Sequence, residues 1–515
     1  MKIMRVLFSI LHLALLTNLI FVLDGSADAG VEVVWAPRTI QASEAGCVLY
    51  VSTDGSDENV GTEQLPLRTI QHAADIAIAG DVICVYPGSY GERIVITRSG
   101  VFGQRIRFRS LGGAVTRGFT ILANHIAVEN FEVTNTLDDW RDAHGIFLEG
   151  TNLVIIDNFV HHVRGDGITC YHHEPYCNDS LIADNIVAYA DGTGVRIFGQ
   201  GNTVERNDIS HSVNALGGDA DGIRFFGSDQ IIRGNFIHDI TNDEAPSAHT
   251  DCFQTFDNSK PPTNDILIEG NVCINVDHQC MMASAETKRQ SSGITFRNNI
   301  CDNNGGQAIN VLQIPNVTIV NNTFSENILY RAVILRDQAH HATILNNIFF
   351  GSYFHYEVDE SSLSGLTADY NLKYPASWRM WVEPHGIWDV DPQFVDSTSK
   401  DFHLQSTSPA IDHGITLSEV VVDLEGVPRP QGYGYDIGAY EYAEAAFMAE
   451  DLNLDGSVDV LDVSLCVNVI LELEKDAGIL VRANVNRDLK VDVQDVQQII
   501  NAIDSEGVGE SNYRR

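Results

Sequence analysis

The middle of the chain is a series of short apolar segments, each followed by a polar turn. Segments such as "NLVIIDN", "DILIEGN" and "GITFRNN" hold Val, Ile, Leu and Phe in runs of only a few residues. Runs of this length, bounded by Gly, Asp and Asn, predict β-strands rather than helices. Because strands this short cannot bury an apolar face alone, we expect successive segments to stack on one another.

An asparagine marks the same point of each segment. Neighbouring copies follow at a nearly constant interval, and the one long interval runs from Asn235 to Asn271, where an insertion around residues 258–263 lengthens a loop. Asparagine tolerates a left-handed backbone and can hydrogen-bond to its copy in the coils above and below. We therefore predict a parallel β-solenoid with an asparagine column made of Asn130, Asn158, Asn185, Asn207, Asn235, Asn271, Asn299, Asn322 and Asn347.

The start of the chain completes this picture. Residues 68–79 place Ile70, Ala73, Ala74 and Ala77 on one face of an expected helix that caps the first coil and prevents edge-to-edge growth of the sheet. Residues 50–96 and the asparagine repeat resemble right-handed parallel β-helix proteins of the pectate-lyase-like class. The resemblance covers about residues 46–400. It implies the fold but no single reaction, because this scaffold carries lyases, hydrolases, epimerases and adhesins.

The charge balance argues against one class of function. The 515 residues include 32 basic and 70 acidic side chains, which gives a net charge of −38. Nucleic-acid binding needs patches of Lys and Arg, so no nucleic-acid partner is expected. The acidic balance fits a soluble extracellular protein that holds divalent cations, and it fits equally a surface that serves only solubility.

The N-terminus has the features of a secretory signal. Lys2 and Arg5 precede an apolar run over residues 6–23, and Ala27 and Ala29 form a small-x-small cleavage site. We expect residues 1–29 to be removed on export; an uncleaved anchor is the alternative, because the apolar run is long. No later stretch is apolar enough to span a bilayer.

Export favours disulfides, and the nine cysteines can be grouped by spacing. Cys170 and Cys177 could close a short loop, and Cys47 and Cys84 could tie the first strands. The remaining groups are Cys252/Cys280 and Cys273/Cys301, which share the same separation of one coil, with Cys466 left over. Spacing alone does not fix the connectivity.

Two twelve-residue segments near the C-terminus alternate oxygen-bearing side chains in the pattern of a calcium loop. "DLNLDGSVDVLD" (451–462) has Gly456 at the sharp turn, and "NVNRDLKVDVQD" (484–495) repeats the pattern. The expected Ca²⁺ ligands are Asp451, Asn453, Asp455, Ser457, Asp459, Asp462, Asn484, Asn486, Asp488, Lys490, Asp492 and Asp495. The second loop should bind more weakly, because Asn484 replaces the usual Asp and Leu489 the usual Gly.

These loops, each followed by an apolar helical pattern, resemble a type I dockerin over residues 449–505. The resemblance implies bound calcium, a cohesin-like scaffold protein as partner and an association with polysaccharide-degrading enzymes. Dockerins that dock onto cohesins typically carry small hydroxyl residues at loop positions that here hold Val460, Leu461, Val493 and Gln494. The contact residues of this chain therefore differ from the family pattern.

Aligning the coils places the charged side chains of the middle coils in columns. Parallel strands lie about 4.8 Å apart, so side chains of one column touch. The columns hold Asp166, Thr193, Asp221 and Asp251; Asp191, Asp219 and His249; and Thr169, Arg196, Arg224 and Gln254. We expect them to line one groove, with the excursion "CYHHEPYC" (170–177) as a wall. The candidate catalytic residues are Asp221, Asp251, His249 and Arg224, and the candidate substrate-binding residues are Asp219, Arg196 and Gln254.

Each residue type has a chemical role in such a groove. Stacked carboxylates bind Ca²⁺ or raise one another's pKa to form an acid/base pair. Stacked arginines repel unless an anion, such as a uronate carboxylate, lies between them. The structural alternative is that the aspartates cap backbone N–H groups and the Arg–Asp pairs are ion-pair ladders between coils. β-Helix pectate lyases use Ca²⁺-binding aspartates with an Arg or Lys base, but no lysine lies in these columns.

We predict a secreted carbohydrate-active protein that cleaves or modifies a polysaccharide, with a uronate-polymer lyase favoured over a hydrolase or epimerase. The alternative is a non-catalytic, glycan-binding surface or matrix protein. The expected parts are a signal peptide (1–29), a right-handed parallel β-helix (46–400), a turn-rich closing module (401–445), a dockerin-like domain (449–505) and a flexible tail (506–515). A capped solenoid is expected to be a monomer.

Overall fold

A computed structural model of the chain describes residues 19–22, 32–35, 46–137, 141–174, 176–213, 219–241, 248–258, 260–287, 289–326, 331–351, 354–375 and 383–443, and in the C-terminal part residues 452–453, 458, 460–471, 479, 483, 485, 491, 493 and 495–500. The chain divides into two compact units, one of residues 35–392 and one of residues 1–34 together with 393–515.

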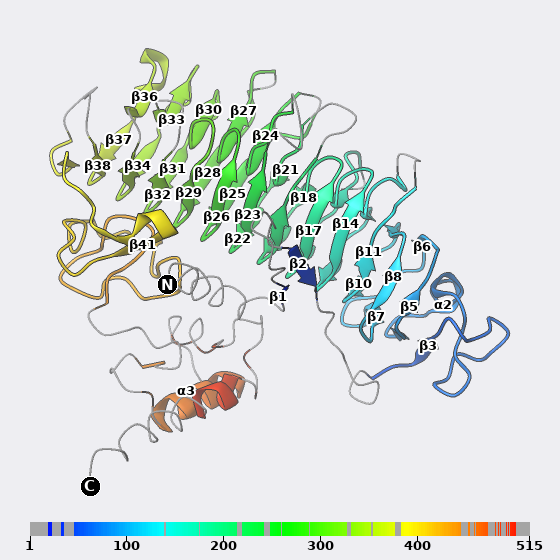
Figure 1. The fold of residues 1–515 in the computed structure, drawn as a ribbon. Coiled ribbons are helices and arrows are strands. Elements are labelled where there is room, and N and C mark those ends of the chain that lie inside the picture. The colour runs from blue at the N-terminus through cyan, green and yellow to red at the C-terminus, as the bar shows by residue number, and fades with distance from the viewer. Residues whose placement is uncertain are drawn as a thin grey trace, which may run out of the picture. The chain divides into compact units, whose positions relative to one another are not determined.

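The first unit is a stack of coils with three parallel walls (Figure 1). Within each coil the chain passes from wall 1 to wall 2 and then to wall 3. Wall 1 consists of β6 (Ile94–Ile96), β9 (Phe119–Ile121), β12 (Ile146–Leu148), β15 (Ile168–Cys170), β18 (Val195–Gln200), β21 (Ile223–Ser228), β24 (Phe253–Phe256), β27 (Met281–Ser284), β30 (Ile309–Leu312), β33 (Arg331–Arg336) and β36 (Phe354–Val358).

In wall 2, too, each strand pairs in parallel with the equivalent strand of the next coil, and walls 1 and 2 together form a 24-stranded sheet. It consists of β3 (Leu49–Val51), β4 (Val82–Val85), β7 (Ile106–Ser110), β10 (Ile126–Glu129), β13 (Val154–Ile156), β16 (Leu181–Ala183), β19 (Thr203–Glu205), β22 (Ile231–Arg233), β25 (Asn264–Glu269), β28 (Ser292–Arg297), β31 (Val317–Val320), β34 (Thr343–Leu345) and β37 (Thr367–Asp369).

Wall 3 is a separate 13-stranded sheet. It consists of β5 (Gly88–Ser89), β8 (Ala114–Thr116), β11 (Glu132–Val133), β14 (Phe159–Val163), β17 (Ile186–Ala190), β20 (Asp208–Ser210), β23 (Phe236–Ile240), β26 (Val272–Val276), β29 (Ile300–Asp302), β32 (Thr323–Ser325), β35 (Ile348–Phe350), β38 (Leu372–Tyr374) and β39 (Ile387–Trp388). Inward-facing Ile, Val, Leu and Phe side chains from all three walls fill the interior. The predicted parallel β-solenoid is confirmed.

The asparagine column lies at the turn between wall 2 and wall 3. From Asn158 to Asn371, the Nδ2 of each asparagine donates to the Oδ1 of the next over 2.9 to 3.1 Å. The left-handed backbone falls on the residue before, such as Asp157 with φ 58°. The prediction of Asn130 is one position too early, because the N–H of Phe131 donates to Asn158 and Phe131 therefore holds the column position.

A buried ion pair ends the asparagine column. Glu383 takes the place of the next asparagine, and its carboxylate accepts from the backbone N–H and the side chain of Asn371, each over 3.3 Å. The Lys373 ammonium lies 2.5 Å from Glu383 Oε1 and between the rings of Tyr356 and Trp388. A charge without exposed surface needs such a partner, so Lys373 and Glu383 hold each other at the last coil.

The other end of the solenoid carries helix α2 (Ile70–Ile76), which lies within the predicted segment 68–79. Its buried face is formed by Ile70, Ala73 and Ala74, as predicted. The Glu92 carboxylate accepts from the N–H groups of Ile70 and Gln71, over 2.8 and 3.1 Å, and so satisfies the free donors of the helix N-terminus.

Four disulfides tie the coils. Cys47–Cys84 and Cys170–Cys177 form the two links suggested by position. The grouping of the other four cysteines by equal spacing is wrong as a pairing: the bonds are Cys252–Cys273 and Cys280–Cys301. Equivalent side chains in adjacent coils point the same way, whereas the two members of each bond approach each other from different sides of one coil.

The second unit contains smaller elements. A two-stranded sheet joins β1 (Leu19–Val22) and β2 (Glu32–Trp35), and β40 (Phe394–Asp396) pairs antiparallel with β41 (Asp401–Leu404). Short 3-10 turns are η3 (Ser397–Ser399) here and η2 (Glu360–Ser362) in the first unit. In the turn-rich segment, Arg429 Nη1 donates to Glu441 Oε2 over 2.7 Å, and both side chains are fully buried.

The asparagine column yields a stability prediction. In an Asn271→Ala variant the N–H of Asn235 and the carbonyls of Ile232 and Glu269 lose buried partners. Because each unsatisfied group costs about 1–3 kcal/mol, a loss on the order of 3 kcal/mol is expected. The measurement is the urea midpoint of the solenoid transition. Asn264→Ala, on a half-buried strand position, is the control and should change it little; equal midpoints for the two variants would contradict the role of the column.

Candidate functional site

The predicted columns exist and lie on the outer side of wall 1. Strand pairing places Arg196 beside Arg224, and Arg224 beside Gln254. Before these strands begin, Asp219 and His249 form an isolated parallel β-bridge, so they too are neighbours in adjacent coils. Acidic and guanidinium side chains that lie about one coil apart in the sequence are therefore neighbours in the three middle coils.

The aspartate column holds consecutive coils together. Asp221 Oδ1 accepts from the N–H of Asp251 over 2.9 Å, and Asp251 Oδ1 accepts from the N–H of Gln279 over 2.8 Å. Asp166 does the same for Thr193 over 3.0 Å. The second oxygen of Asp221 faces Arg224 Nε at 2.5 Å, and that of Asp251 accepts from Gln254 Nε2 over 3.1 Å. These contacts are the ones expected if the aspartates cap backbone N–H groups, which is the structural alternative to a catalytic role.

Burial changes the titration of this column. Burial raises the pKa of Asp221 to about 6, although Arg224 and the N–H of Asp251 oppose it. Burial and the neighbouring Asp221 carboxyl raise the pKa of Asp251 well above its ordinary value. Burial opposes the charge of Arg224 too, but Asp221 and Asp219 outweigh it and raise the pKa of that guanidinium. Arg224 is therefore a fixed cation next to carboxyls whose pKa values burial raises.

Arg196 is held from the preceding coil. Its Nη2 lies 2.5 Å from Asp166 Oδ2 and its Nε donates to Thr169 Oγ1 over 3.0 Å. Burial opposes ionisation of Asp166, but Arg196, His144 and the N–H of Thr193 outweigh it and lower the pKa of that carboxyl. Arg196 and Arg224 thus stand side by side, each braced by acids.

His249 and Asp219 lie at the rim of the site. Asp219 forms an ion pair with Arg224, and its side chain keeps 33% of its surface exposed. The His249 ring is exposed and lies 5.1 Å from the ring of His278. Within the described residues it makes no hydrogen bond to Asp221 or Asp251. The predicted catalytic group therefore divides into a buried part and an exposed histidine.

An aromatic row runs beside the arginine column, two residues further along each strand. Phe198 stacks on Phe226 with centroids 4.6 Å apart, and Phe226 meets Phe256 at 5.1 Å. Both Phe198 and Phe226 are buried. From the Cys170–Cys177 loop, His172 and Tyr176 each lie 6.3 Å from the Phe198 ring. This position agrees with the predicted wall.

Lys260 is the functional candidate that the column alignment missed. It comes from the insertion around residues 258–263, and its Nζ lies 5.5 Å from the centre of the Phe198 ring. The Arg196 guanidinium lies 6.0 Å from the same ring. Burial lowers the pKa of Lys260, and Arg196 and Arg224 lower it further. The one long interval between asparagines was the sequence signal for this loop, although spacing cannot tell where a loop folds.

Calcium does not fit the aspartate column as it is built. Both oxygens of Asp221 and of Asp251 already accept hydrogen bonds or face a guanidinium. Among the described residues no three His, Cys, Asp or Glu side chains gather as a metal site. Calcium prefers six to eight oxygen ligands, and a neighbouring arginine repels it.

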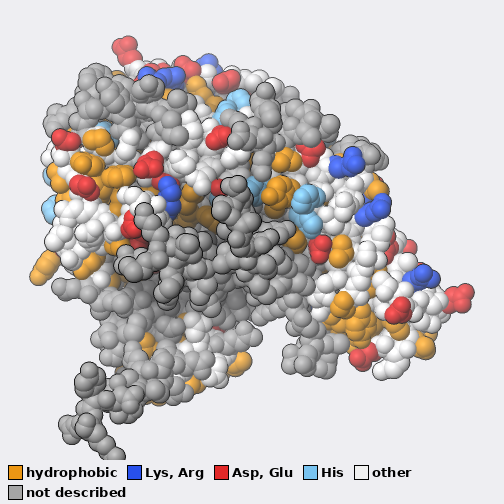
Figure 2. Space-filling view, viewed as in Figure 1, with side chains coloured by type: hydrophobic (Ala, Val, Ile, Leu, Met, Phe, Trp, Pro, Cys, Tyr) orange, Lys and Arg blue, Asp and Glu red, His pale blue; other side chains and the backbone are white. Residues whose placement is uncertain are grey.

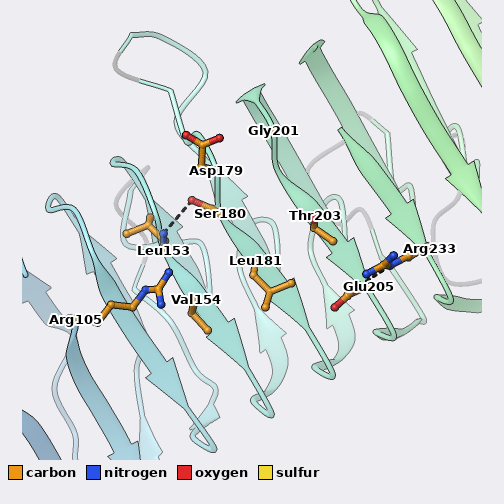
Figure 3. Close-up of a pocket in the computed structure, with 10 residues that line it drawn as sticks. All are labelled: Arg105, Leu153, Val154, Asp179, Ser180, Leu181, Gly201, Thr203, Glu205 and Arg233. Carbon is orange, nitrogen blue, oxygen red and sulfur yellow. Dashed lines mark hydrogen bonds and ion pairs between the residues drawn. The ribbon is translucent and has the colours of Figure 1, made fainter. Parts of the chain in front are cut away.

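A second polar region lies on wall 2, away from these columns. A depression of about 410 Å³ lies there, lined by residues that include Arg105, Ser180, Thr203, Glu205 and Arg233 (Figure 3). Three of its charged groups already have partners: Arg105 Nε donates to the carbonyl of Asn152, and Arg233 Nε lies 2.6 Å from Glu205 Oε2.

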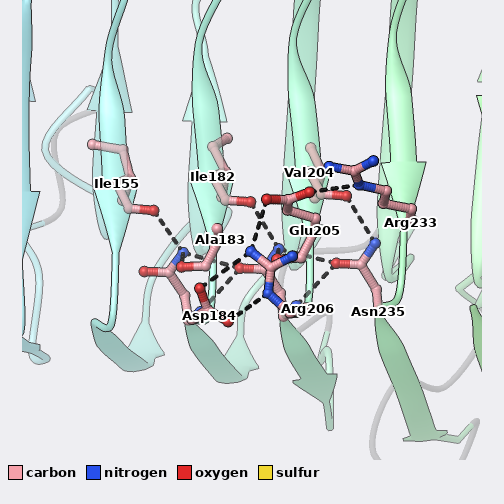
Figure 4. Close-up of polar contacts among 11 residues, drawn as sticks. Ile155, Ile182, Ala183, Asp184, Val204, Glu205, Arg206, Arg233 and Asn235 are labelled. Atoms are coloured by element: carbon pink, nitrogen blue, oxygen red, sulfur yellow. Dashed lines mark hydrogen bonds and ion pairs between the residues drawn. The ribbon is translucent and has the colours of Figure 1, made fainter. Parts of the chain in front are cut away.

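The pairing on wall 2 is a ladder between coils. Glu205 is buried and lies between Arg206 and Arg233, at 2.7 and 2.6 Å (Figure 4). Arg206 also meets Asp184 at 2.9 Å. Burial raises the pKa of Asp184 to about 7, against the lowering influence of Arg206. These contacts stabilise the stack and leave few free groups for a ligand.

The C-terminal loops repeat in their burial as in their sequence. Equivalent positions of the two loops match: Leu452 with Val485 and Cys466 with Ile499 are buried, and Asp462 with Asp495 are fully buried. Helix α3 (Val460–Ile470) begins within the last three residues of the first loop. Asp462 Oδ1 accepts from the N–H groups of Leu452 and Asn453, over 2.7 and 3.2 Å, and so closes that loop.

These loops fit calcium. Burial of an ionised carboxylate without a cation is costly, and Asp462 and Asp495 both occupy the last ligand position of a loop rich in oxygen donors. Of the predicted ligands, only Asn453, Asp462 and Asp495 belong to the described residues. The others lie outside them: Asp451, Asp455, Ser457, Asp459, Asn484, Asn486, Asp488, Lys490 and Asp492.

One face of the molecule shows how its acidic side chains are distributed. On the face shown in Figure 2, the coloured Asp and Glu side chains are scattered among basic and apolar ones rather than gathered in one patch. Across the part of the chain that the structure describes, every helix is too short or too polar to cross a membrane.

The fold and the columned outer face define the class of the protein: a right-handed parallel β-helix with an attached calcium-loop domain. Residues 49–231 match a profile described as a Pel9A-like right-handed β-helix region, and residues 144–349 match the general right-handed β-helix region. Residues 449–504 match the dockerin type I domain. These parts of the chain are therefore similar to a Pel9A-like right-handed β-helix and to a type I dockerin domain.

Two curated proteins match short parts of the chain. The chain is 33% identical to the uncharacterized protein YwoF of Bacillus subtilis over 109 residues, which is 21% of this chain and 22% of that protein. It is 41% identical to pectate lyase PEL9 of Emericella nidulans over 82 residues, 16% of this chain and 20% of the relative. The chain therefore matches only about a fifth of the length of these curated relatives.

Two solved structures share the fold. The crystal structure of pectate lyase Pel9A superposes with a TM-score of 0.50 at 18% identity, covering 78% of this chain and 98% of that one. The complex of XylC with xylose also gives 0.50, at 12% identity, covering 77% and 98%. The dockerin domain implies calcium binding, a cohesin as partner and an extracellular place of action.

The calcium loops yield a second prediction. An Asp462→Ala variant of the full chain should bind calcium at least about tenfold more weakly in the first loop, because the buried closing carboxylate is lost. Calcium titration followed by protection of the C-terminal segment from protease measures this. Asp75→Ala, at an exposed carboxylate of α2, is the control. Unchanged calcium affinity in Asp462→Ala would contradict the assignment.

Proposed function

We propose that the solenoid cleaves a uronate polymer by β-elimination on the outer face of wall 1. One observation carries the proposal: Arg196, Arg224 and Lys260 converge beside the aromatic row in a chain of net charge −38. Cations gathered against this overall charge suit an anionic ligand, and the half-buried ring of Phe256 suits the apolar face of a sugar. The Pel9A-like match and the similarity to a pectate lyase support the same substrate class.

The chemistry needs a base and a neutralised carboxylate. Arg196 and Arg224 would hold the C6 carboxylate and stabilise the charge that develops on it. Lys260, as the neutral amine, would take the proton from C5; the electron pair then forms the C4=C5 double bond while the C4–O bond breaks. The leaving oxygen takes a proton from water, and the ammonium of Lys260 returns its proton to solvent.

The aspartates act in this scheme through other residues. Asp219 and Asp221 hold the Arg224 guanidinium, and Asp251 holds the amide of Gln254. We propose them as positioning residues because Asp221 and Asp251 are fully buried and cannot touch a polymer. His249, exposed at the rim, is proposed as a contact to a neighbouring sugar.

The dockerin would attach this activity to a cohesin-bearing scaffold. Val460 and Val493, at the same position of the two loops, are 68% and 74% exposed, and Leu461 is 55% exposed. Exposed apolar side chains in equivalent places suit a protein contact. The proposed docking contact is therefore apolar, where the family pattern has hydroxyl groups.

A polymer panel tests the function. The full chain is incubated with pectate, alginate and neutral glycans, and the ultraviolet absorbance of the unsaturated product and the reducing ends are both recorded. The proposal expects absorbance from a uronate polymer alone. Reducing ends without absorbance would instead indicate hydrolysis, and retention of a polymer without cleavage would support the alternative of a glycan-binding matrix protein.

A further inference from the structure

We propose that Arg196 and Arg224 replace a bound calcium ion at the wall 1 site, so that guanidinium N–H groups hold the uronate carboxylate directly. This inference rests on the proposed uronate ligand but not on its cleavage. It assigns calcium dependence to the dockerin loops and calcium independence to the solenoid.

The carboxylate oxygens of Asp221 and Asp251 already have partners within the protein. Asp221 gives one oxygen to the N–H of Asp251 and the other to Arg224. Asp251 gives one to the N–H of Gln279 and the other to Gln254. A calcium ion would have to displace backbone donors that join consecutive coils, and those donors would be left unsatisfied in the interior of the stack.

The Arg196 and Arg224 guanidinium groups are placed to bind a carboxylate in place of a calcium ion. Arg196 and Arg224 are paired in strand register, so their side chains leave adjacent strands about 4.8 Å apart. Each uses Nε and Nη2 for its polar partners. Within the described residues, the Nη1 group of each has no hydrogen-bond partner. Two such donors from neighbouring strands suit the two oxygens of one carboxylate.

The bracing acids explain how two arginines tolerate this proximity. Asp166 neutralises Arg196 from one side, and Asp219 and Asp221 neutralise Arg224 from the other. The exposed fractions of the two arginine side chains are 21% and 11%, so both reach the surface. At that surface a divalent cation would lie beside two guanidinium groups that cannot coordinate it, whereas a carboxylate could accept hydrogen bonds from both.

Gln254 supplies a second, independent sign of a ligand. It is the next member of the arginine column and is 5% exposed, yet its Oε1 has no partner among the described residues. A buried acceptor without a donor is costly. A sugar hydroxyl next to the carboxylate would donate to it, which places the ligand along Arg196, Arg224 and Gln254.

The test is calorimetric binding of short oligogalacturonate and oligomannuronate to the full chain, in EDTA and in calcium. At least one probe should bind with dissociation constants within about twofold of each other in the two buffers. Arg196→Lys and Arg224→Lys should each weaken binding about tenfold or more, with no rescue by calcium, because an ammonium lacks the planar pair of donors. Arg233→Lys, paired with Glu205 on wall 2, is the matched control.

The outcomes separate the inference from the proposed function. Binding that is lost in EDTA and restored by calcium overturns the inference, even if the polymer is cleaved. Calcium-independent binding without any cleavage supports the inference and overturns the proposed reaction. Absence of binding in both buffers overturns the inference and the uronate ligand together. The thermal transition of each lysine variant shows whether a loss of binding reflects unfolding.

Discussion

A Lys260→Ala variant is expected to cleave the uronate polymer about 10²- to 10⁴-fold more slowly than the unchanged chain, with little change in the urea midpoint. The reason is that the amine comes from the inserted loop, beside Arg196 and Phe198, and belongs to no strand of the solenoid. Initial rates of ultraviolet absorbance measure the loss.

Lys260→Arg separates the base from a simple positive charge. Arginine keeps the charge but stays protonated, so this variant should remain as slow as Lys260→Ala. Recovery of most of the rate by arginine would contradict the base role and assign Lys260 to substrate binding alone.

The pH profile provides a further check on the same residue. Only the neutral amine accepts a proton, so kcat/KM of the unchanged chain should rise with pH as Lys260 loses its proton. Burial and the two arginines lower the pKa of Lys260, so the rise should be centred below the ordinary range of a lysine. A profile that falls with rising pH would contradict this assignment.

An Arg224→Ala variant is expected to lose about 10²- to 10³-fold in kcat/KM, because charge developing on the substrate carboxylate loses one braced donor. The change also leaves Asp219 and Asp221 without their cation, so the variant needs a fold check by its thermal transition. Arg224→Lys keeps a charge near these acids and should still lose most of the activity.

Arg233→Ala is the matched control for Arg224→Ala. Arg233 also pairs with a buried acid, Glu205, but it lies on wall 2 and is 49% exposed. It should cleave the polymer at nearly the unchanged rate. A similar loss in both variants would mean that general destabilisation, rather than the wall 1 face, explains the effect.

The period of the sequence was sufficient for the architecture. Asparagine spacing predicted the coils, and alignment of the coils at the polar residue before a small one set the register that places Arg196 beside Arg224. It failed by one position at Asn130, because the coil before Asn158 has Phe131 where later coils have asparagine. A repeat is least informative at its margin, where the residue that marks it differs.

The chemistry of the site was less accessible to sequence reasoning. A column of aspartates has the same pattern whether it binds a cation or caps N–H groups, and only the contacts of Asp221 and Asp251 distinguish the two. Lys260 was missed because an inserted loop has no column, and its direction depends on packing against Phe198. The cysteine grouping failed because the spacing of the cysteines indicates which coil each belongs to, but not the direction in which its side chain points.

The most direct test of the account is a crystal structure of the Lys260→Arg variant soaked with the oligouronide that binds in calorimetry. The account predicts the uronate carboxylate against Arg196 and Arg224 on wall 1, with a sugar hydroxyl donating to Gln254 Oε1. Ligand density in the wall 2 depression near Arg105 and Arg233, or a calcium ion between the sugar and Asp221, would contradict it.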